Sequence, residues 1–383
     1  MNRPLRILLV SAAYRPYPSG VSEHTYNLAL NFKKIGQKVS VLTTKFPQFE
    51  HLVADEARDE IPVYRFGRAV LVPLNRSYAT LPVGWKIPLQ IAHFFSSHSF
   101  DIVHCHGVFW PEISYWALRY SESTNLITFL TAGFRLHSFG RNLFQLVFRN
   151  QIKKIHGKIA ISKRARAAIE PYIPGEYRII PSGIDLNWFQ PADDKDKQNR
   201  PSTILFLGRL DKRKGIDILL QALPLIQKSI PNIRVTVVGT GMMEKKCRQL
   251  IKNLGLSHAV QMQGPVHRKD LPFYYQNCDV YCSPALGGET QGIVLLEAMA
   301  CGVPVVASNI PGYDETIQNG VNGILFPPGD IKALSNSIIQ ILVNKELRNK
   351  LIANGLERAK DYAWPVIAQR TLSYYYELLA KRF

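Results

Sequence analysis

Residues 204–239 read ILFLGRLDKRKGIDILLQALPLIQKSIPNIRVTVVG, a short apolar run, a helical pattern and a second apolar run. Each of the two apolar runs, 204–208 and 235–239, ends at a glycine. Further short apolar runs follow, separated by helical patterns, at 260–263, 280–283 and 303–307. Short apolar runs that alternate with helices are typical of parallel sheets with crossover helices. The second half of the chain therefore predicts a doubly wound, Rossmann-like α/β domain.

The first half of the chain repeats this pattern. An apolar run at 7–10 precedes a Pro/Gly loop that ends at Gly20, and further apolar runs follow at 39–43, 102–104, 126–129 and 159–162. Residues 191–201, PADDKDKQNRP, are polar and flanked by prolines, which predicts a linker. We therefore expect an α/β fold with two Rossmann-like domains, 1–190 and 202–362, facing a cleft, and a C-terminal helix, 363–383, packing back on the first domain.

Composition excludes several classes of protein. Of the 383 residues, 46% are hydrophobic and 20% are charged, which is ordinary for a globular chain and excludes collagenous and disordered proteins. The five cysteines form no CxxC pair, so neither a disulfide framework nor a zinc site is indicated, and a reducing, cytoplasmic compartment fits best. The apolar run at 7–10 is too short for a convincing signal peptide and favours a buried first strand. No window is long and apolar enough to predict a transmembrane helix.

The chain is strongly basic, with a net charge of +18, which suggests an anionic partner. Residues 135–178 carry ten Lys and Arg against two Glu. This segment is either a solvated basic face or a surface for anionic lipid. Motifs of nucleic-acid binding, such as an aromatic RNP pattern or zinc-finger spacing, are absent from the sequence.

Residues 283–302, SPALGGETQGIVLLEAMACG, predict a strand that ends in a glycine-rich turn, with a helix that begins near Gly292. Free N–H groups at a helix N-terminus suit a phosphate or a sugar oxygen. Glu289 and Glu297 would repel phosphate, so each could instead accept hydrogen bonds from hydroxyl groups beside a diphosphate. The alternative is that Glu289 caps the helix and Glu297 is paired inside the fold.

Residues 208–215, GRLDKRKG, place four cations within six residues after the first strand of the second domain. They predict either a diphosphate site or an exposed basic loop. A third glycine turn, at Gly239, lacks the last glycine of GxGxxG. Gly20 would allow close approach of a ligand in the first domain. His104 and His106 have no carboxylate nearby in sequence, which favours structural or substrate-contact roles over a metal site.

These blocks resemble the retaining GT-B glycosyltransferases of the large family that includes sucrose and glycogen-type synthases. The chain looks most like the bacterial phosphatidyl-myo-inositol mannosyltransferases. The similar stretches span nearly the whole chain: 67–70 with Pro73 and Asn75, 101–106, 158–162, 279–300 and 362–366.

The resemblance implies roles for matched positions. Arg209 and Lys214 would hold the donor diphosphate, and Glu289 would bind a sugar hydroxyl. Gly20 would let the first domain close over the phosphates, and Glu297 would bind the ribose. The remaining donor-site positions would be Gly239 and the backbone N–H groups of Gly292 and Ile293. Asn75 and Ser77 fall where the mannosyltransferases contact the lipid head group.

The predicted reaction is therefore retaining transfer of a hexose, mannose by the resemblance, from a nucleotide-diphosphate sugar to a lipid-linked or polyol hydroxyl. No DxD-like motif lies at the site, so no obligatory metal is expected. The enzyme would be cytoplasmic and peripheral on the inner face of the plasma membrane. Alternatives are the same transfer to a soluble saccharide, a nucleotide-sugar epimerase and a basic nucleic-acid-binding protein.

Three departures from the family pattern concern the donor and the membrane. Leu130 stands where the mannosyltransferases carry a histidine thought to lie by the donor sugar, and Gln291 replaces a usual phenylalanine. Residues 81–95 hold a single Lys where a basic amphipathic helix should follow Ser77. Any contact with membrane would therefore use different chemistry, such as shallow insertion of the apolar residues in 81–95 or simple charge attraction.

Overall fold

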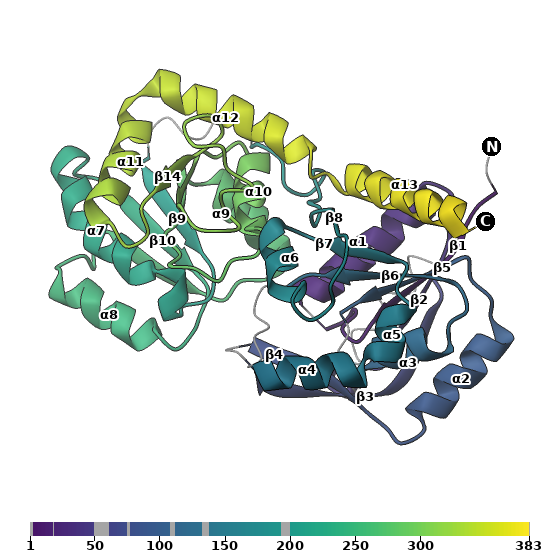
Figure 1. The fold of residues 1–383 in the computed structure, drawn as a ribbon. Helices are drawn as coiled ribbons and strands as arrows, with labels where there is room; N and C mark the ends of the chain where they lie inside the picture. The colour runs from purple at the N-terminus through teal and green to yellow at the C-terminus, as the bar shows by residue number, and fades with distance from the viewer. Residues whose placement is uncertain are drawn as a thin grey trace. The chain divides into compact units, whose positions relative to one another are not determined.

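The structure, a computed structural model, describes residues 3–17, 19–49, 61–74, 77–107, 112–131, 138–192 and 200–382. The chain divides into two compact units, and Figure 1 shows their elements. Unit 1 is Met1–Gly183 with Trp364–Phe383, and unit 2 is Ile184–Ala363. Both are doubly wound α/β units, so the predicted fold class is confirmed. The linker predicted at 191–201 and the cleft remain predictions, and residues 193–199 lie outside the described residues.

Unit 1 is built on an eight-stranded sheet in the order β4-β3-β2-β1-β5-β6-β7-β8. Neighbouring strands are parallel except β3 and β4, which form an antiparallel pair at one edge. The strands are β1 Arg6–Ser11, β2 Lys38–Lys45, β3 Val63–Leu74, β4 Ser77–Val83, β5 Ile102–His106, β6 Thr124–Phe129, β7 Gly157–Ala160 and β8 Arg178–Ile179.

Helices cover both faces of this sheet. Alternate residues of a strand point to opposite faces, and β1 shows it: Leu8 and Val10 enter one core cluster, whereas Ile7 and Leu9 enter another. The first face is covered by α2 Ile87–Ser97, α3 Ile113–Tyr120, α4 Ser138–Val147 and α5 Arg149–Lys153, and the second by α1 Gly20–Lys34 and α13 Trp364–Arg382 (Figure 1). A short helix, α6 Lys163–Ile169, follows β7.

Unit 2 is built on a six-stranded, all-parallel sheet in the order β11-β10-β9-β12-β13-β14. Its strands are β9 Thr203–Leu207, β10 Arg234–Val238, β11 Val260–Gly264, β12 Val280–Ser283, β13 Val305–Ser308 and β14 Ile324–Phe326. The strands predicted for the second domain all lie at or within two residues of the predicted runs.

Two layers of helices also enclose the sheet of unit 2. Ile204 and Phe206 of β9 pack with the first layer, and Leu205 packs with the second. The first layer holds α7 Ile216–Ser229, α8 Glu244–Asn253 and α11 Ile331–Val343, and the second holds α9 Leu271–Gln276 and α10 Ile293–Ala300, with α12 Lys345–Lys360 against α10. Two short 3₁₀ turns, η3 Lys212–Lys214 and η4 Arg268–Asp270, lie in the loops after β9 and β11.

The apolar segment 81–95 does not form one element. Its first residues end β4, and α2 begins at Ile87 with Pro88 in its first turn, where a proline costs no hydrogen bond. Ile87, Ile91 and Phe94 are buried in the core of unit 1, so the packing interpretation holds for them. Trp85, in contrast, is 82% exposed.

Candidate functional site

The candidate site of unit 2 lies at the carboxyl ends of β9 and β12. Strands β10 and β11 lie on one side of β9 within the sheet, and the next strand along the chain, β12, pairs with the opposite side of β9. Open α/β sheets bind ligands outside the strand ends at such a reversal of strand order. The loops that leave these two strands are the segments that the sequence singled out, 208–215 and 284–292.

A glycine fixes how closely these two loops approach. Gly215 has a φ of +68°, and a Cβ there would lie 1.9 Å from the carbonyl oxygen of Pro284, so no larger residue fits. Asp211 shapes the preceding turn, because its side chain accepts the backbone N–H of Lys214 at 3.0 Å. Arg209 extends from the same loop with its Nη2 atom 3.7 Å from Asp211 Oδ2.

Glu289 lies where the two loops meet. Its carboxylate is nearly buried and contacts two cations through the same oxygen, Oε1. Lys214 Nζ lies 2.9 Å from this oxygen, and the guanidinium of Arg213 also donates to it. The structure therefore brings together two residues that were predicted separately for the donor site, Lys214 and Glu289, and adds Arg213. Glu289 is not a helix cap, because the N-cap position of α10 belongs to Gly292.

The N-terminus of α10 points its unpaired N–H groups toward this end of the sheet. Gly292 occupies the cap position with a φ of +76°, and a Cβ there would lie 2.7 Å from the ring of Tyr313. Among the described residues no side chain caps this terminus, so the N–H of Ile293 keeps the positive end of the helix dipole available to an anion.

Glu297 lies farther along α10 and is buried. The hydroxyl of Tyr275 donates to its Oε2 atom at 2.7 Å. Burial raises the pKa of Glu297, although the Tyr275 hydrogen bond and the nearby positive charge of Arg268 act in the opposite direction. The predicted alternative of a pair inside the fold therefore describes the structure, and it leaves the proposed ribose contact a prediction.

Gly239 has a clear packing reason to be glycine. With a φ of +126°, a Cβ there would lie 2.0 Å from the carbonyl oxygen of Gly208. The turn after β10 thus packs directly against the loop after β9 and supports it from the side. A direct contact between Gly239 and the donor stays a prediction.

The predicted residues of the first domain all belong to unit 1. Gly20 begins α1, whose cap Ser19 accepts the N–H of Ser22, and nothing among the described residues would meet a Cβ at Gly20 within 4 Å. This open backbone suits the approach of a ligand. Asn75 lies outside the described residues, and Ser77 begins β4 without a described side chain.

Unit 1 has its own reversal of strand order, between β1 and β5, and three buried histidines lie beside it. His106 ends β5, with its ring centroid 5.2 Å from that of His24 and 4.6 Å from that of His104. His24 bonds Ser182 at 3.0 Å, whereas His104 lies 2.6 Å from both Tyr375 Oη and Thr128 Oγ1.

Burial keeps these histidines neutral. It lowers the pKa of His24 and of His104 to about 3, and the pKa of His106 falls as well. Neither ring nitrogen of His106 has a well-formed hydrogen bond among the described residues, although the backbone of Val10 is close. No group of His, Cys, Asp and Glu in the described part of the chain has the arrangement of a metal site. Leu130 packs beside Ala160 and Ile161. The position where the mannosyltransferases carry a histidine therefore makes an apolar contact in this chain.

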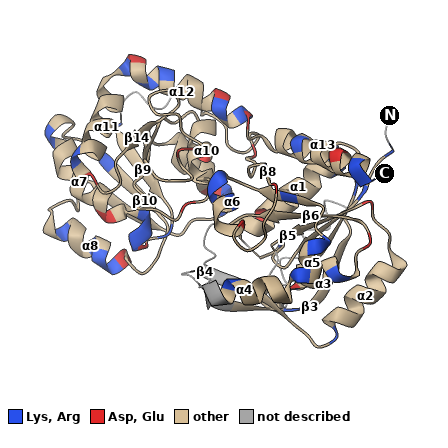
Figure 2. Cartoon of the chain, viewed as in Figure 1, with Lys and Arg blue, Asp and Glu red and all other residues tan. Residues whose placement is uncertain are grey.

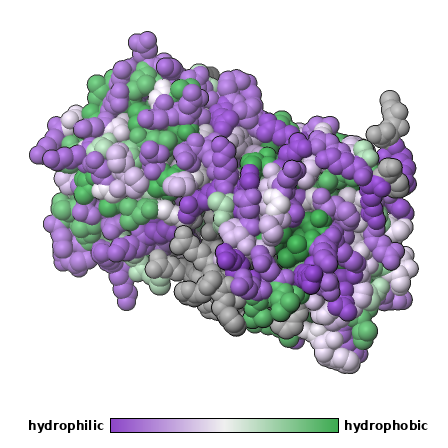
Figure 3. All heavy atoms as spheres, in the orientation of Figure 1, coloured by the Kyte–Doolittle hydropathy of each residue, from purple (hydrophilic) through white to green (hydrophobic). Residues whose placement is uncertain are grey.

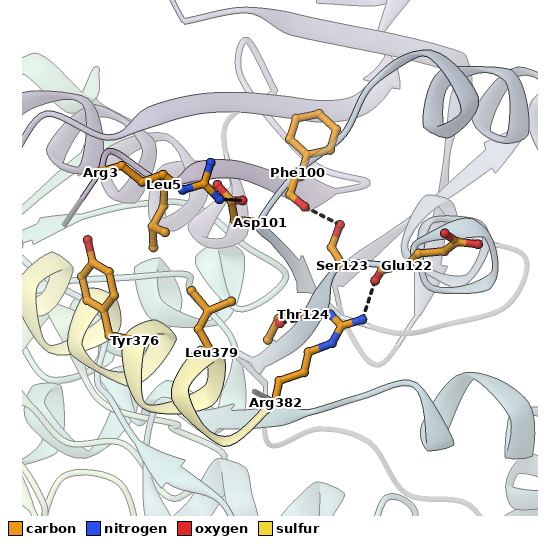
Figure 4. A pocket seen from close by; sticks show the side chains of 10 residues that line it. All are labelled: Arg3, Leu5, Phe100, Asp101, Glu122, Ser123, Thr124, Tyr376, Leu379 and Arg382. Carbon is orange, nitrogen blue, oxygen red and sulfur yellow. Dashed lines mark hydrogen bonds and ion pairs between the residues drawn. The ribbon is translucent and has the colours of Figure 1, made fainter.

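A pocket of about 470 Å³ lies elsewhere in unit 1, at the amino ends of β1, β5 and β6 (Figure 4). Three of its charged side chains already have partners: Arg3 bonds Asp101 at 2.9 Å, and Arg382 donates to the backbone carbonyl oxygen of Glu122 at 2.7 Å. This end of a parallel sheet is opposite to the end where such folds bind ligands. We therefore assign the pocket no part in the site.

Sequence reasoning missed three contributors to the site in unit 2. Arg213 was visible only as one of four cations in its loop, and the pairing with Glu289 spans 76 residues of sequence. Tyr275 and Arg268 belong to α9 and η4, and no local pattern distinguishes them from ordinary helix residues. Contacts of this kind depend on the fold and have no signature in a single sequence.

Two family profiles match the chain. "Glycosyl transferases group 1" matches residues 190–358, and "Glycosyltransferase Family 4" matches residues 18–188. Together they cover both units. The described residues contain no helix of the length and apolar character needed to cross a membrane.

Glycosyltransferases that align over nearly their whole length also resemble this chain. A phosphatidyl-myo-inositol mannosyltransferase of Mycobacterium leprae is 32% identical over 97% of this chain and 96% of its own length. An alpha-monoglucosyldiacylglycerol synthase of Acholeplasma laidlawii is 26% identical over 98% of this chain and 98% of its own length. The crystal structure of Anabaena HepE with UDP and glucose matches 97% of this chain and 99% of its own, with a TM-score of 0.72 and 21% identity.

Proposed function

The chain belongs to the family 4 type of GT-B glycosyltransferases, and we propose that it transfers a hexose to the head-group hydroxyl of a lipid. The donor would be a nucleotide-diphosphate sugar, and the product would keep the anomeric configuration of the donor. Mannose is the first sugar to test, because the mannosyltransferase of Mycobacterium leprae is 32% identical. A glucose donor is the second, because HepE was crystallised with UDP and glucose.

The observation that carries this proposal is the cluster of cations beside an uncapped helix. Lys214 and Arg213 meet at Glu289, Arg209 extends from the same loop, and α10 begins four residues after Glu289. A departing diphosphate develops negative charge, and donors that are already aimed at that charge stabilise the transition state. Glu289 then binds a sugar hydroxyl beside the diphosphate, and Glu297 binds the ribose.

The chemical step needs no protein nucleophile. The bond between the anomeric carbon and the diphosphate oxygen breaks, and the acceptor oxygen bonds that carbon on the same face. The proton of the acceptor hydroxyl moves to the leaving phosphate oxygen, so charge and atoms balance. Glu289 and Glu297 are held by side chains of unit 2, which suits binding rather than covalent attack. Retaining hydrolases, in contrast, place two carboxylates about 5 Å apart across the bond.

A lipid acceptor requires the enzyme to reach a membrane surface, and α4 of unit 1 has an exposed apolar face that could bind there. Leu143, Leu146 and Val147 are exposed on this helix between Arg141 and Arg149. Figure 3 shows hydrophobic side chains at the surface in the region of α4, and Figure 2 shows basic side chains on α5 and α6. An exposed apolar face flanked by cations is suited to shallow binding at an anionic bilayer. This exposed face supports the proposal that the enzyme binds peripherally at a membrane surface, for which we propose the inner face of the plasma membrane.

Activity with matched acceptors tests the proposal. The enzyme should convert a nucleotide-diphosphate hexose in the presence of phosphatidylinositol or diacylglycerol vesicles and release the nucleoside diphosphate. Proton NMR of the product reports the anomeric configuration and so tests retention. Transfer to soluble saccharides alone would make the acceptor a saccharide, and the absence of transfer from every nucleotide sugar would overturn the proposal.

A further inference from the structure

We propose that Arg213 is a positioning residue that holds Glu289 in place when Lys214 turns from this carboxylate to the donor diphosphate. The inference rests on the proposed function, because it concerns the donor of that reaction. Positive charge exceeds negative charge at this carboxylate. Lys214 and Arg213 both contact Oε1 of Glu289, although one cation is enough to neutralise one carboxylate. The Glu289 side chain is only 11% exposed, so water screens these contacts weakly.

The two cations are anchored differently. Nη1 of Arg213 also donates to the carbonyl oxygens of Gly287 at 3.3 Å and Gly288 at 3.0 Å. The backbone carbonyl of Arg213 accepts the N–H of Leu286 at 2.7 Å, which ties both ends of this residue to the Glu289 loop. A Cβ on Gly288 would lie 2.6 Å from Cδ of Arg213, so the side chain packs closely against that loop.

Lys214 is the cation that is able to move. Within the described part of the chain, Glu289 is the one ion-pair partner of its ammonium group. Its stem passes the open backbone of Gly208, where a Cβ would lie 3.8 Å from Cδ of Lys214. A lysine is a point charge on a flexible stem, whereas the planar guanidinium of Arg213 holds several acceptors in fixed directions.

These differences order the events at the site. A diphosphate carries more charge than a carboxylate and attracts the ammonium of Lys214. Because Arg213 stays bound to Glu289 and its loop, the carboxylate remains paired and keeps its second oxygen available to a sugar hydroxyl. Without Arg213, Lys214 becomes the sole counterion of Glu289, and the diphosphate has to compete with this carboxylate for it.

A double-mutant cycle on nucleoside diphosphate binding tests the competition. Titrations with UDP and with GDP use the full chain and the variants Arg213→Ala, Glu289→Gln and Arg213→Ala/Glu289→Gln. Lys212→Ala is the matched control, because it removes the same charge from the same 3₁₀ turn at an exposed position.

We expect Arg213→Ala to weaken binding about tenfold, a typical size for coupling between two sites. Lys212→Ala should weaken it less than about twofold, because solvent screens an exposed charge. Glu289→Gln should tighten binding by freeing Lys214, and the double variant should bind like Glu289→Gln alone. A role of Arg213 in folding alone would not be cancelled by Glu289→Gln.

Three results would overturn the inference. Equal effects of Arg213→Ala and Lys212→Ala would show that only general charge matters, and an Arg213→Ala loss that persists in the Glu289→Gln background would indicate direct contact with phosphate. Failure of the unmodified chain to bind any nucleoside diphosphate would overturn the proposed function, and the inference with it. If thermal unfolding shows Arg213→Ala to be unfolded, Arg213→Lys replaces it in the cycle, with an intermediate loss expected and no loss overturning the inference.

Discussion

Each of the two sheets has a point where the strand order reverses, and the two points differ in their chemistry. In unit 2 this point carries Lys214, Arg213 and Glu289 in ion pairs, whereas in unit 1 it carries histidines that burial keeps neutral. The fold therefore determines where a ligand binds, and the side chains determine which charge is tolerated there. Unit 2 is suited to an anion, and the corresponding region of unit 1 excludes charge.

Acidification is expected to have the largest effect, because it puts charge into the neutral region of unit 1. His24 and His104 have folded pKa values of about 3, against 6.5 when exposed. The unfolded chain therefore binds more protons below pH 6.5, and the free energy of unfolding falls as the pH drops from 6.5 toward 3. Each histidine contributes about 1.4 kcal/mol per pH unit in this window. Denaturant unfolding at pH 7.5, 6.0 and 5.0 measures the slope.

His106→Leu is the variant that isolates one histidine from other acid effects. It removes a ring without a well-formed hydrogen bond, so the free energy of unfolding at pH 7.5 should change little. The slope between pH 6 and 5 should decrease, because burial lowers the pKa of His106 and the variant removes this contribution. An unchanged slope would mean that His106 is already charged in the folded protein. The difference between a charged site in unit 2 and neutral histidines in unit 1 would then be wrong.

Removing cations from unit 2 should reduce turnover more than stability. Arg209→Ala and Lys214→Ala each remove a contact that strengthens as the diphosphate leaves, worth about 2–4 kcal/mol, or about 30- to 1,000-fold in rate. Steady-state kinetics and thermal unfolding are measured on the same preparations. Lys212→Ala should retain most activity, and near-normal turnover of both Arg209→Ala and Lys214→Ala would rule out the donor-site assignment.

The two carboxylates of unit 2 should separate nucleotide from sugar. Glu297→Ala should weaken binding of the nucleoside diphosphate about tenfold, the loss of a hydrogen bond with a charged group. Glu289→Ala should not weaken nucleoside diphosphate binding but should reduce affinity for the complete nucleotide sugar. Parallel titrations with the nucleoside diphosphate and the nucleotide sugar test this division of roles. Equal losses of affinity for both ligands in both variants would contradict it.

Membrane binding is expected to show the smallest effect, and it concerns unit 1 alone. Leu146→Glu removes an apolar contact and adds a negative charge, which should weaken binding to anionic vesicles about fivefold, since one charge near the surface is worth about 1 kcal/mol. Val343→Glu in unit 2 is the control, because Val343 and Leu146 are both 69% exposed. Co-sedimentation at two salt concentrations measures both variants. Binding that is absent at low salt, or equal losses in the two variants, would remove α4 as the membrane surface.

Sequence patterns were sufficient for the parts of the fold that depend on local periodicity. The apolar runs located the strands of unit 2, and the glycines and charges after them indicated the candidate site, because both signals lie within a few neighbouring residues. The pairing of Glu289 with Arg213 and the antiparallel β3–β4 pair were not predicted. The first joins distant segments, and the second lies in a stretch whose apolar residues fit a strand or a helix equally well. His24 joined the histidines of β5 for the same reason, since only the fold brings α1 beside that strand.

The division of the chain has a consequence for its synthesis. Unit 2, Ile184–Ala363, is one continuous segment, whereas unit 1 needs Trp364–Phe383 to complete it. Tyr375 of this last segment is buried in the core of unit 1 and bonds His104. During translation unit 2 can therefore finish folding before unit 1, which is incomplete until α13 has left the ribosome. Expression of 184–363 alone should yield a folded fragment, while 1–183 should remain incomplete until a peptide of 364–383 is supplied.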